Sequence, residues 1–149
     1  MAAGITIEPD KIQEFIYEFE LYAKANLNYE DVTAKLDIDA LTSLDVFTME
    51  TVKQLQLLEP FGQANPKPMF AAKGVKLAAH PRRVGAKGDH LQLTVTDNKA
   101  TVRCIGFRMG KLEKKLLEKE FFNVAFHPQL NTYNGNTNVQ LQIRDIQFE

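Results

Sequence analysis

The spacing of hydrophobic residues changes along this chain of 149 residues, from a helical period to a strand period. Within residues 9–25, apolar side chains recur at intervals of three and four, at Ile12, Phe15, Ile16, Phe19 and Ala23. Such spacing places these side chains on one face of an α-helix. Pro9 suits the first turn, where its missing N–H donor is not needed, and Asn26 suits the end. The pattern therefore predicts an amphipathic helix over residues 9–25.

Two short elements are predicted next. Residues 36–40 alternate between apolar and polar side chains, which favours a short strand. Thr48 is a typical helix N-cap, because its hydroxyl accepts a hydrogen bond from an N–H group of the first turn. The helix after it would turn one apolar face to the core, formed by Met49, Val52, Leu55 and Leu58. Pro60 ends it, because the residue before a proline avoids the helical conformation.

Beyond residue 68 the apolar period falls to two, which is typical of half-buried strands. The predicted strands cover residues 69–84, 90–97, 100–109, 121–130 and 138–148. A short helix is predicted between Met109 and Lys119, and Asn134 with Gly135 is a pair favoured in type I′ hairpin turns. Five strands with a helix between the third and the fourth are the layout of an OB-fold. The sequence therefore predicts a mainly β fold with some α, a five-stranded Greek-key OB-fold barrel preceded by an α-helical N-terminal segment.

The composition is that of an ordinary globular protein, with 44% hydrophobic and 25% charged residues. No apolar run approaches the roughly 18 residues of a spanning helix, and residues 1–11 lack the pattern of a secretory signal. We therefore expect no membrane partner and a cytoplasmic location. The single cysteine, Cys104, cannot form an internal disulfide. Its position in a predicted strand favours a small buried residue over a catalytic nucleophile.

The net charge of −1 conceals two oppositely charged halves. Residues 1–65 hold 4 Lys and Arg against 12 Asp and Glu, for a charge of −8, whereas residues 66–149 hold 14 against 7, for +7. A basic half favours a polyanionic partner such as nucleic acid. The alternative is a basic surface that is merely solvated and has no such partner.

Candidate DNA-binding residues are concentrated in the basic half. Proteins that bind single strands combine cations, which contact phosphates, with flat side chains on which bases stack. The candidates are Lys73, Lys76, Arg82, Arg83, Lys87, His90, Arg103, Phe107, Arg108, Tyr133 and Asn134. Core packing is the favoured alternative for Phe107. Tyr133 is equally suited to stacking and to supporting its hairpin.

Motifs for catalysis are not recognisable: the sequence has no phosphate-binding Gly-rich loop, no His-Glu-x-x-His and no Gly-x-Ser-x-Gly. The three histidines, His80, His90 and His127, are scattered and not spaced as metal ligands. Asp37 and Asp39 could hold a hard cation, but an exposed strand face is the favoured interpretation. We therefore predict no catalytic residue, no metal site and no cofactor in this chain, and an independent hydrolase is the least favoured hypothesis.

The segment LEPFGQANPKPMF, residues 58–70, closely resembles the Pro-Phe-Gly-x-Gly-Asn-Pro-x-Pro-x-Phe signature of RecJ-type single-strand DNA exonucleases of the DHH superfamily. GDHLQLTVTD, IGF and NTYNGNTNVQLQIRDI resemble later segments of the same family. The start, MAAG and an acidic amphipathic helix, is similar to the segment just after the Gly-Gly-His motif of the DHHA1 domain. Two residues depart from the family pattern. Ala64 replaces a glycine, so a left-handed backbone there would be strained, and Tyr133 replaces the usual Trp.

The resemblance implies two parts, residues 1–59 as the end of a DHHA1 domain with a linker and residues 60–149 as an OB domain that binds single-stranded DNA. It also implies that a rigid joint connects them. The residues of this joint are Pro60, Phe61, Gly62, Asn65, Pro66 and Pro68.

A parent enzyme is implied as well, which degrades single-stranded DNA in the 5′ to 3′ direction in recombination and repair and uses Mn²⁺ or Mg²⁺. Its Asp-His-His and Gly-Gly-His motifs do not occur in this sequence, so we expect a C-terminal fragment that is inactive alone. The upstream DHH and DHHA1 domains would then be partners. The alternative is a structural or protein-docking module that braces the nuclease core without strong DNA contact.

Overall fold

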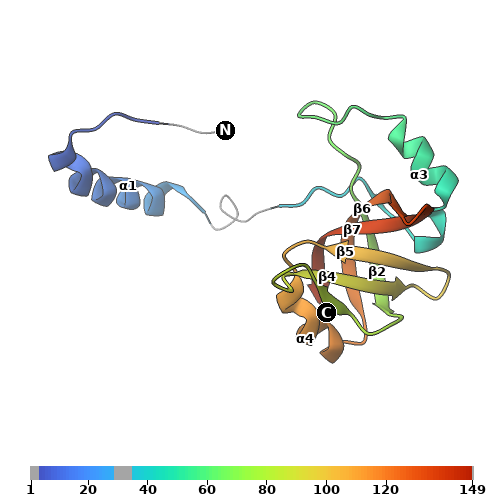
Figure 1. The fold of residues 1–149 in the computed structure, drawn as a ribbon. Helices are drawn as coiled ribbons and strands as arrows, with labels where there is room; N and C mark the ends of the chain where they lie inside the picture. The colour runs from blue at the N-terminus through green and yellow to red at the C-terminus, as the bar shows by residue number, and fades with distance from the viewer. Residues whose placement is uncertain (1–3, 29–34, 149) are drawn as a thin grey trace. The chain divides into compact units, whose positions relative to one another are not determined.

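The computed structural model describes residues 4–28 and 35–148. The chain divides into two compact units, Met1–Leu36 and Asp37–Glu149. The second unit holds all of the strands (Figure 1). The division lies before the residue 59–60 boundary expected from the sequence, so residues 37–59 fold together with the strands that come after them.

The first unit contains the predicted N-terminal helix, a 3-10 turn η1 (Pro9–Lys11) followed by α1 (Ile12–Asn26). The Asn26 side chain donates to the carbonyl of Tyr22 at 2.8 Å near the helix end. Phe15 and Phe19 stack with ring centroids 5.6 Å apart. No described residue of α1 is buried, and Phe19 is 60% exposed. The apolar face is therefore present as predicted, and nothing in residues 4–28 of the first unit buries it.

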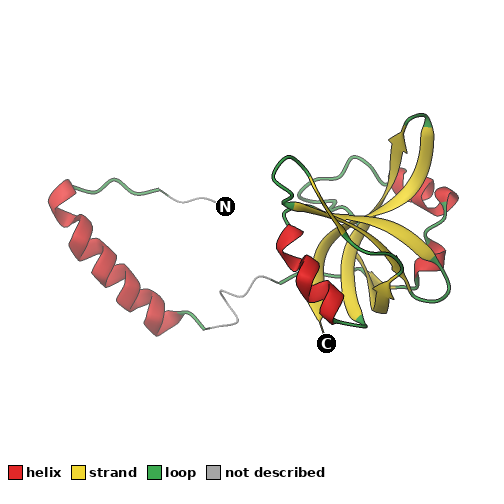
Figure 2. Ribbon diagram, turned by 60° about the horizontal axis from the view of Figure 1, so that its bottom comes forward, coloured by secondary structure: helices red, strands yellow, loops and turns green. Residues whose placement is uncertain are grey.

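The second unit is a closed barrel of five long strands, as Figure 2 shows in yellow. These strands are β2 (Phe70–Leu77), β4 (His90–Thr96), β5 (Thr101–Gly106), β6 (Phe122–Tyr133) and β7 (Asn136–Phe148). They follow the order β2-β6-β7-β5-β4, and β4 returns to β2 through the pairs Lys76–Thr96 and Leu77–Val95. The β5–β7 pairing is parallel, and the other pairings within the barrel are antiparallel. This is the OB-fold that the sequence predicted.

Two short strands add to the barrel, and both correct the sequence prediction. The strand expected over residues 69–84 is split into β2 and β3 (Arg82–Val84), because the buried Pro81 has no N–H group for a ladder. The strand expected over residues 36–40 is reduced to β1 (Ala40–Leu41), which pairs in parallel with the start of β2. The preceding Asp39 uses its carboxylate to accept the N–H of Met69 at 2.7 Å.

The second predicted helix packs on the barrel after a 3-10 turn, η2 (Leu44–Val46). It is α3 (Met49–Gln56), and the predicted cap is confirmed because the Thr48 hydroxyl accepts from the Thr51 N–H at 3.1 Å. Only Val52 of the expected apolar face is fully buried. The helix ends before Leu58, which is 52% exposed.

Inward-facing side chains of the barrel strands form the core. Leu91, Leu93 and Val95 of β4 are 0–1% exposed, as the alternation predicted. The third predicted helix is η3 (Gly110–Leu112) followed by α4 (Glu113–Glu118), and it contributes the buried Leu116. Cys104 is also buried in β5, as predicted for a small strand residue, and burial raises the pKa of its thiol.

Left-handed backbone occurs at a few defined positions. Asn134 and Gly135, between β6 and β7, have φ angles of 50° and 76°, which confirms the type I′ turn. The other non-glycine residues with positive φ in the described chain are Asn98 and Arg108. Ala64 is not among them, so the substitution in the signature causes no left-handed strain.

Candidate nucleic-acid interface

The outer face of β4, β5 and β7 carries polar side chains in register. Thr94 lies opposite Arg103, and Arg103 lies opposite Gln140 of the parallel strand β7. One step along, Ile105 lies between Gln92 and Gln142. Arg103 is exposed and the others are half-buried. The alternation of the strands thus turns the core residues inward and presents these six side chains outward.

Three hollows on this face adjoin one another at Arg103, which lines each of them. The first extends to His80 and Arg82, before and at the start of β3. The second extends along the β6–β7 hairpin to Tyr133 and Asn134, and the third extends to Asp45 of η2. We call this continuous depression the groove. It brings together Arg82, Arg103, Tyr133 and Asn134 of the predicted DNA-binding residues.

Arg103 and Arg82 are positive charges with no ion pair among the residues that the structure describes. Tyr133 is 73% exposed at the hairpin tip. Charges and aromatic rings that remain available to solvent can contact phosphates and bases. The groove therefore has the chemistry needed to hold a flexible polyanion.

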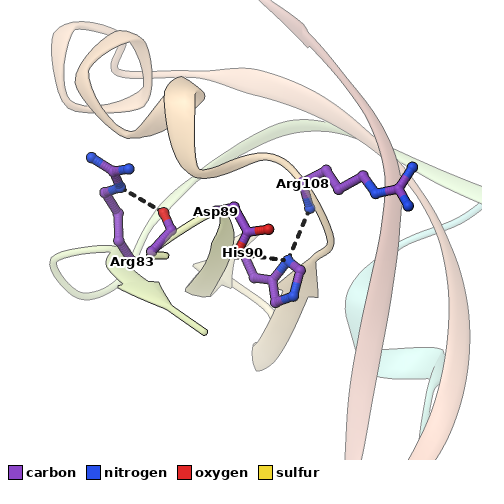
Figure 3. A network of polar contacts seen from close by, with 5 residues as sticks. Arg83, Asp89, His90 and Arg108 are labelled. Carbon is purple, nitrogen blue, oxygen red and sulfur yellow. Dashed lines mark hydrogen bonds and ion pairs between the residues drawn. The ribbon is translucent and has the colours of Figure 1, made fainter. Parts of the chain in front are cut away.

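Other candidates form a network that fixes the loop between β3 and β4 (Figure 3). The Nε–H of Arg83 donates to the carbonyl of Gly88 at 2.7 Å, and His90 Nδ1 accepts the backbone N–H of Arg108 at 3.2 Å. Gly110 donates its N–H to the carbonyl of Asp89, and a Cβ on Gly110 would lie 2.4 Å from the Gly88 oxygen. Arg83 and His90 therefore support the loop rather than line the groove.

The remaining candidates lie outside the three hollows. Lys73 is exposed where the β2–β6 register shifts, and Lys76 pairs with Thr96 where the barrel closes. Lys87 is exposed in the loop that Arg83 supports. Phe107 is 49% exposed and meets the His90 ring edge-on at 5.2 Å, so it is not a core residue. It stays available as a second aromatic surface just beyond β5.

The segment of residues 58–70, here called the joint segment, is held by side-chain hydrogen bonds. The Asn65 amide donates to the carbonyls of Leu58 at 2.8 Å and Pro60 at 3.1 Å. His127 of β6 contacts the Pro68 carbonyl through Nδ1 at 2.7 Å. Burial lowers the pKa of His127 although the Pro68 carbonyl opposes this shift, so the neutral ring donates Nδ1–H. The Asn65 contacts therefore hold the joint segment together internally, and the His127 contact fixes it to β6 of the barrel.

Sequence reasoning missed the glutamines of the outer face. It also missed the anchoring roles of Asp39, of His127 and of Asp97, which accepts the backbone N–H of Leu44 at 2.7 Å. The signal for the glutamines was present, because Gln92, Gln140 and Gln142 occupy outward positions of alternating strands. The anchoring residues gave no such signal, because their partners lie far away along the chain, 30 residues away for Asp39 and 59 for His127.

The described residues do not fit a metal ion. They contain no group of three or more His, Cys, Asp or Glu side chains that could hold one. Asp39, one of the two candidate carboxylates, is already bonded to the backbone of Met69. In residues 4–28 and 35–148 no helix is long and apolar enough to cross a membrane.

A closed five-stranded barrel with a groove across its second and third strands defines an OB-fold binding domain. The profile of the RecJ OB domain matches residues 38–145, and the chain therefore belongs to that family. It is 26% identical over 145 residues to the single-stranded-DNA-specific exonuclease RecJ of Bacillus subtilis (strain 168), covering 97% of this chain and 18% of the relative.

Solved structures of RecJ from Thermus thermophilus share the fold. The structure in complex with Mg²⁺ matches with a TM-score of 0.74 and 24% identity, over 97% of this chain and 21% of that chain. The structure in complex with Mn²⁺ matches with a TM-score of 0.72 and 25% identity, over 98% and 20%. The chain thus spans about a fifth of the length of these relatives.

Proposed function

We propose that this chain is the single-stranded DNA-binding module of a RecJ-type exonuclease. That enzyme would degrade single strands in the 5′ to 3′ direction during DNA recombination and repair, in the cytoplasm. The observation that carries the proposal is the groove, which joins Arg103, Arg82 and Tyr133 on the strands and loops that OB-folds use for oligonucleotides. The Bacillus subtilis relative is single-strand-specific, which supports the same class of ligand.

Arg103 is the centre of the proposed site, because each of the three hollows includes it. A guanidinium group gives a planar fork of donors that matches phosphate oxygens. Tyr133 at one end of the groove offers a ring on which a base can stack. A flexible single strand can follow the groove across β4, β5 and β7, whereas a rigid duplex keeps its bases enclosed.

The test is fluorescence anisotropy of labelled single-stranded and duplex oligonucleotides of equal length at low salt. We expect binding of the single strand only, and about tenfold weaker binding by Arg103→Gln, since hydrogen bonds to charged groups contribute about 1.5–3 kcal/mol. Arg144→Gln is the matched control, because Arg144 is exposed on β7 but lines none of the three hollows. Equal affinity for duplex, or no binding of the single strand, would refute the proposal.

A second function, docking to the nuclease core, is favoured by the exposed apolar face of α1. We propose that the first unit, residues 1–36, is the end of a DHHA1 domain and that Ile12, Phe15, Ile16 and Phe19 pack against its upstream part. Relatives about five times longer have room for such domains. Phe15→Glu should abolish pull-down of the upstream DHH and DHHA1 domains, whereas Tyr17→Glu, beside the stripe, should preserve it. Equal pull-down by both variants would show that this face of α1 does not bind the upstream domains.

The parent enzyme would use Mn²⁺ or Mg²⁺ held by its upstream domains. Two-metal hydrolysis requires a cluster of carboxylate and imidazole ligands around two ions, and the described part of this chain has no such cluster. We therefore expect the isolated chain to release no nucleotides from labelled single strands in Mn²⁺. Cleavage of the labelled strands by protein that has been purified to constant specific activity would contradict this expectation.

A further inference from the structure

The floor of the groove is mostly uncharged. Residues 66–149 contain 14 Lys and Arg, but only Arg82 and Arg103 line the three hollows. The positive charge of this half is thus distributed over the barrel rather than concentrated where a strand would lie. Phosphate contacts alone would therefore hold only a short length of the DNA strand.

Side-chain amides surround two residues of this outer face, Arg103 in the groove and Ile105, which lies on the same strand just outside the three hollows. Gln92 and Gln142 flank Ile105, while Thr94 and Gln140 flank Arg103. Ile105 is half-buried, so part of an apolar side chain is accessible between two amides. A base has the same character, because its faces are apolar and its edges carry hydrogen-bonding groups.

The amides have unused hydrogen-bonding capacity. The side chains of Gln92 and Gln142 make no hydrogen bond within the described chain. Gln140 accepts from Gln129 Nε2 at 3.3 Å through its oxygen, which leaves its NH₂ group to act as a donor. A free amide offers two donors and an acceptor oxygen, and rotation by 180° exchanges them. Such groups can therefore satisfy the edge of any base.

We propose that the groove, together with the adjoining Ile105 and Gln142 of the same face, recognises the base side of a single strand. The contacts would come from the amides of Gln92, Gln140 and Gln142, and most phosphates would stay in solvent. This inference rests on the proposed DNA-binding function and deepens it. Selection against duplex is one consequence, because pairing occupies the Watson–Crick edges and stacking covers the faces of the bases, so that neither is open to the amides and Ile105. A second consequence is binding of single strands of any base sequence, because each free amide can turn either its donors or its acceptor toward the base.

The first experiment compares a mixed-sequence single strand with an abasic strand of the same length and the same number of phosphates. We expect at least tenfold weaker anisotropy-detected binding of the abasic strand. The slope of log K against log salt should be about −1.4 for two neutralised phosphates, against about −5 if all seven predicted cationic candidates contacted phosphates.

The second experiment uses the double variant Gln92→Leu with Gln142→Leu, which retains side-chain volume and removes hydrogen bonding. We expect at least tenfold weaker binding of the mixed-sequence strand with an unchanged salt slope. The matched control is Gln147→Leu, because Gln147 is exposed on β7 and lies opposite Asn123 of β6 rather than opposite Ile105. Urea unfolding checks that the variants remain folded, and Gln142→Asn provides a milder change if the double variant does not.

Equal binding of abasic and mixed-sequence strands, with a slope near −5, would overturn this inference while the DNA-binding function survives. Binding that is unaffected in the folded glutamine variants would also overturn it. Absence of binding to any strand would overturn both the inference and the proposed function.

Discussion

Two hairpin turns of the barrel share an asparagine at the second position and differ in their surroundings. Residues 97–100 join β4 to β5, and residues 133–136 join β6 to β7. Each turn places an asparagine in the left-handed region, Asn98 with φ 70° and Asn134 with φ 50°. The second turn has a further left-handed residue, Gly135 with φ 76°, so the two backbones are related but not identical.

Their tertiary contacts separate the two turns. Asp97 accepts the backbone N–H groups of Lys99, Ala100 and the distant, buried Leu44, at 3.0, 2.9 and 2.7 Å. The second turn is crossed by a hydrogen bond between the hydroxyls of Thr132 and Thr137 at 2.8 Å, and Tyr133 remains exposed. The first turn thus stabilises the fold, and the second presents side chains to the groove.

The largest effect on stability is expected for Asp97→Ala. Hydrogen bonds to charged groups contribute about 1.5–3 kcal/mol each, and the loss leaves the N–H of buried Leu44 unsatisfied. We expect the free energy of unfolding in urea to fall by about 3 kcal/mol. Asp145→Ala is the control, because Asp145 is an exposed carboxylate on β7. An equal loss in both variants would show that the turn has no special role.

Tyr133→Ala should change binding and not stability. Stacking on an aromatic ring contributes about 1–3 kcal/mol per base, so we expect about tenfold weaker binding of single-stranded DNA in anisotropy titrations. The control is Tyr22→Ala, because Tyr22 is similarly exposed, on α1. A fall in the free energy of unfolding comparable with that of Asp97→Ala would instead assign Tyr133 to hairpin support.

Gly135→Ala should destabilise the second turn slightly. The φ angle of 76° is strained for a residue with a Cβ, at about 1–2 kcal/mol, although no atom lies within 4 Å of the added group. Gly62→Ala is the control that separates backbone strain from steric contact with neighbours. Gly62 also has open surroundings, but its φ is not positive. We expect the free energy of unfolding in urea to fall by about 1 kcal/mol for Gly135→Ala and to stay unchanged for Gly62→Ala.

The sequence predicts those parts of the fold that depend on neighbours along the chain. The alternation of β4, the Thr48 cap and the Asn134–Gly135 turn are local, and the structure contains all three. The short strand β1 was predicted too long because its limits depend on the β2 register and on Asp39, which bonds a residue 30 positions away. Tertiary pairing rather than propensity sets such limits.

The site was predicted in part, for the same reason. Arg103 and Tyr133 were among the candidates, as a cation and an aromatic residue of the basic half, and both line the groove. Arg83 and His90 looked equally suitable for DNA binding in the sequence. In the structure, however, they form hydrogen bonds with the backbone of Gly88 and Arg108 and so stabilise the loop between β3 and β4. The glutamines were overlooked because a polar residue on a strand is read as solvated until the structure shows that it borders a groove.

The smallest expected effect is the pH dependence that Asp97 imposes on stability. Burial raises the pKa of this carboxyl, but the N–H groups of Leu44, Ala100 and Lys99 together outweigh burial and hold the pKa below its ordinary value. The folded protein therefore binds this proton less tightly than the unfolded chain, whose pKa is about 3.9. The stabilisation is complete well above that value and is lost as the pH falls through the folded pKa.

The measurement is the difference in unfolding free energy between the protein and Asp97→Asn, followed by urea titration from pH 7 to pH 2.5. We expect a constant difference down to about pH 5 and a decrease below it, since the ordinary carboxyl pKa is about 3.9. Tyr133→Ala should show the same pH profile as the unmodified protein, because the second turn contains no carboxylate. If the difference in unfolding free energy stays constant to pH 2.5, the protonated Asp97 side chain stabilises its turn as well as the carboxylate does. The charge of Asp97 would then not contribute to the difference between the two hairpins.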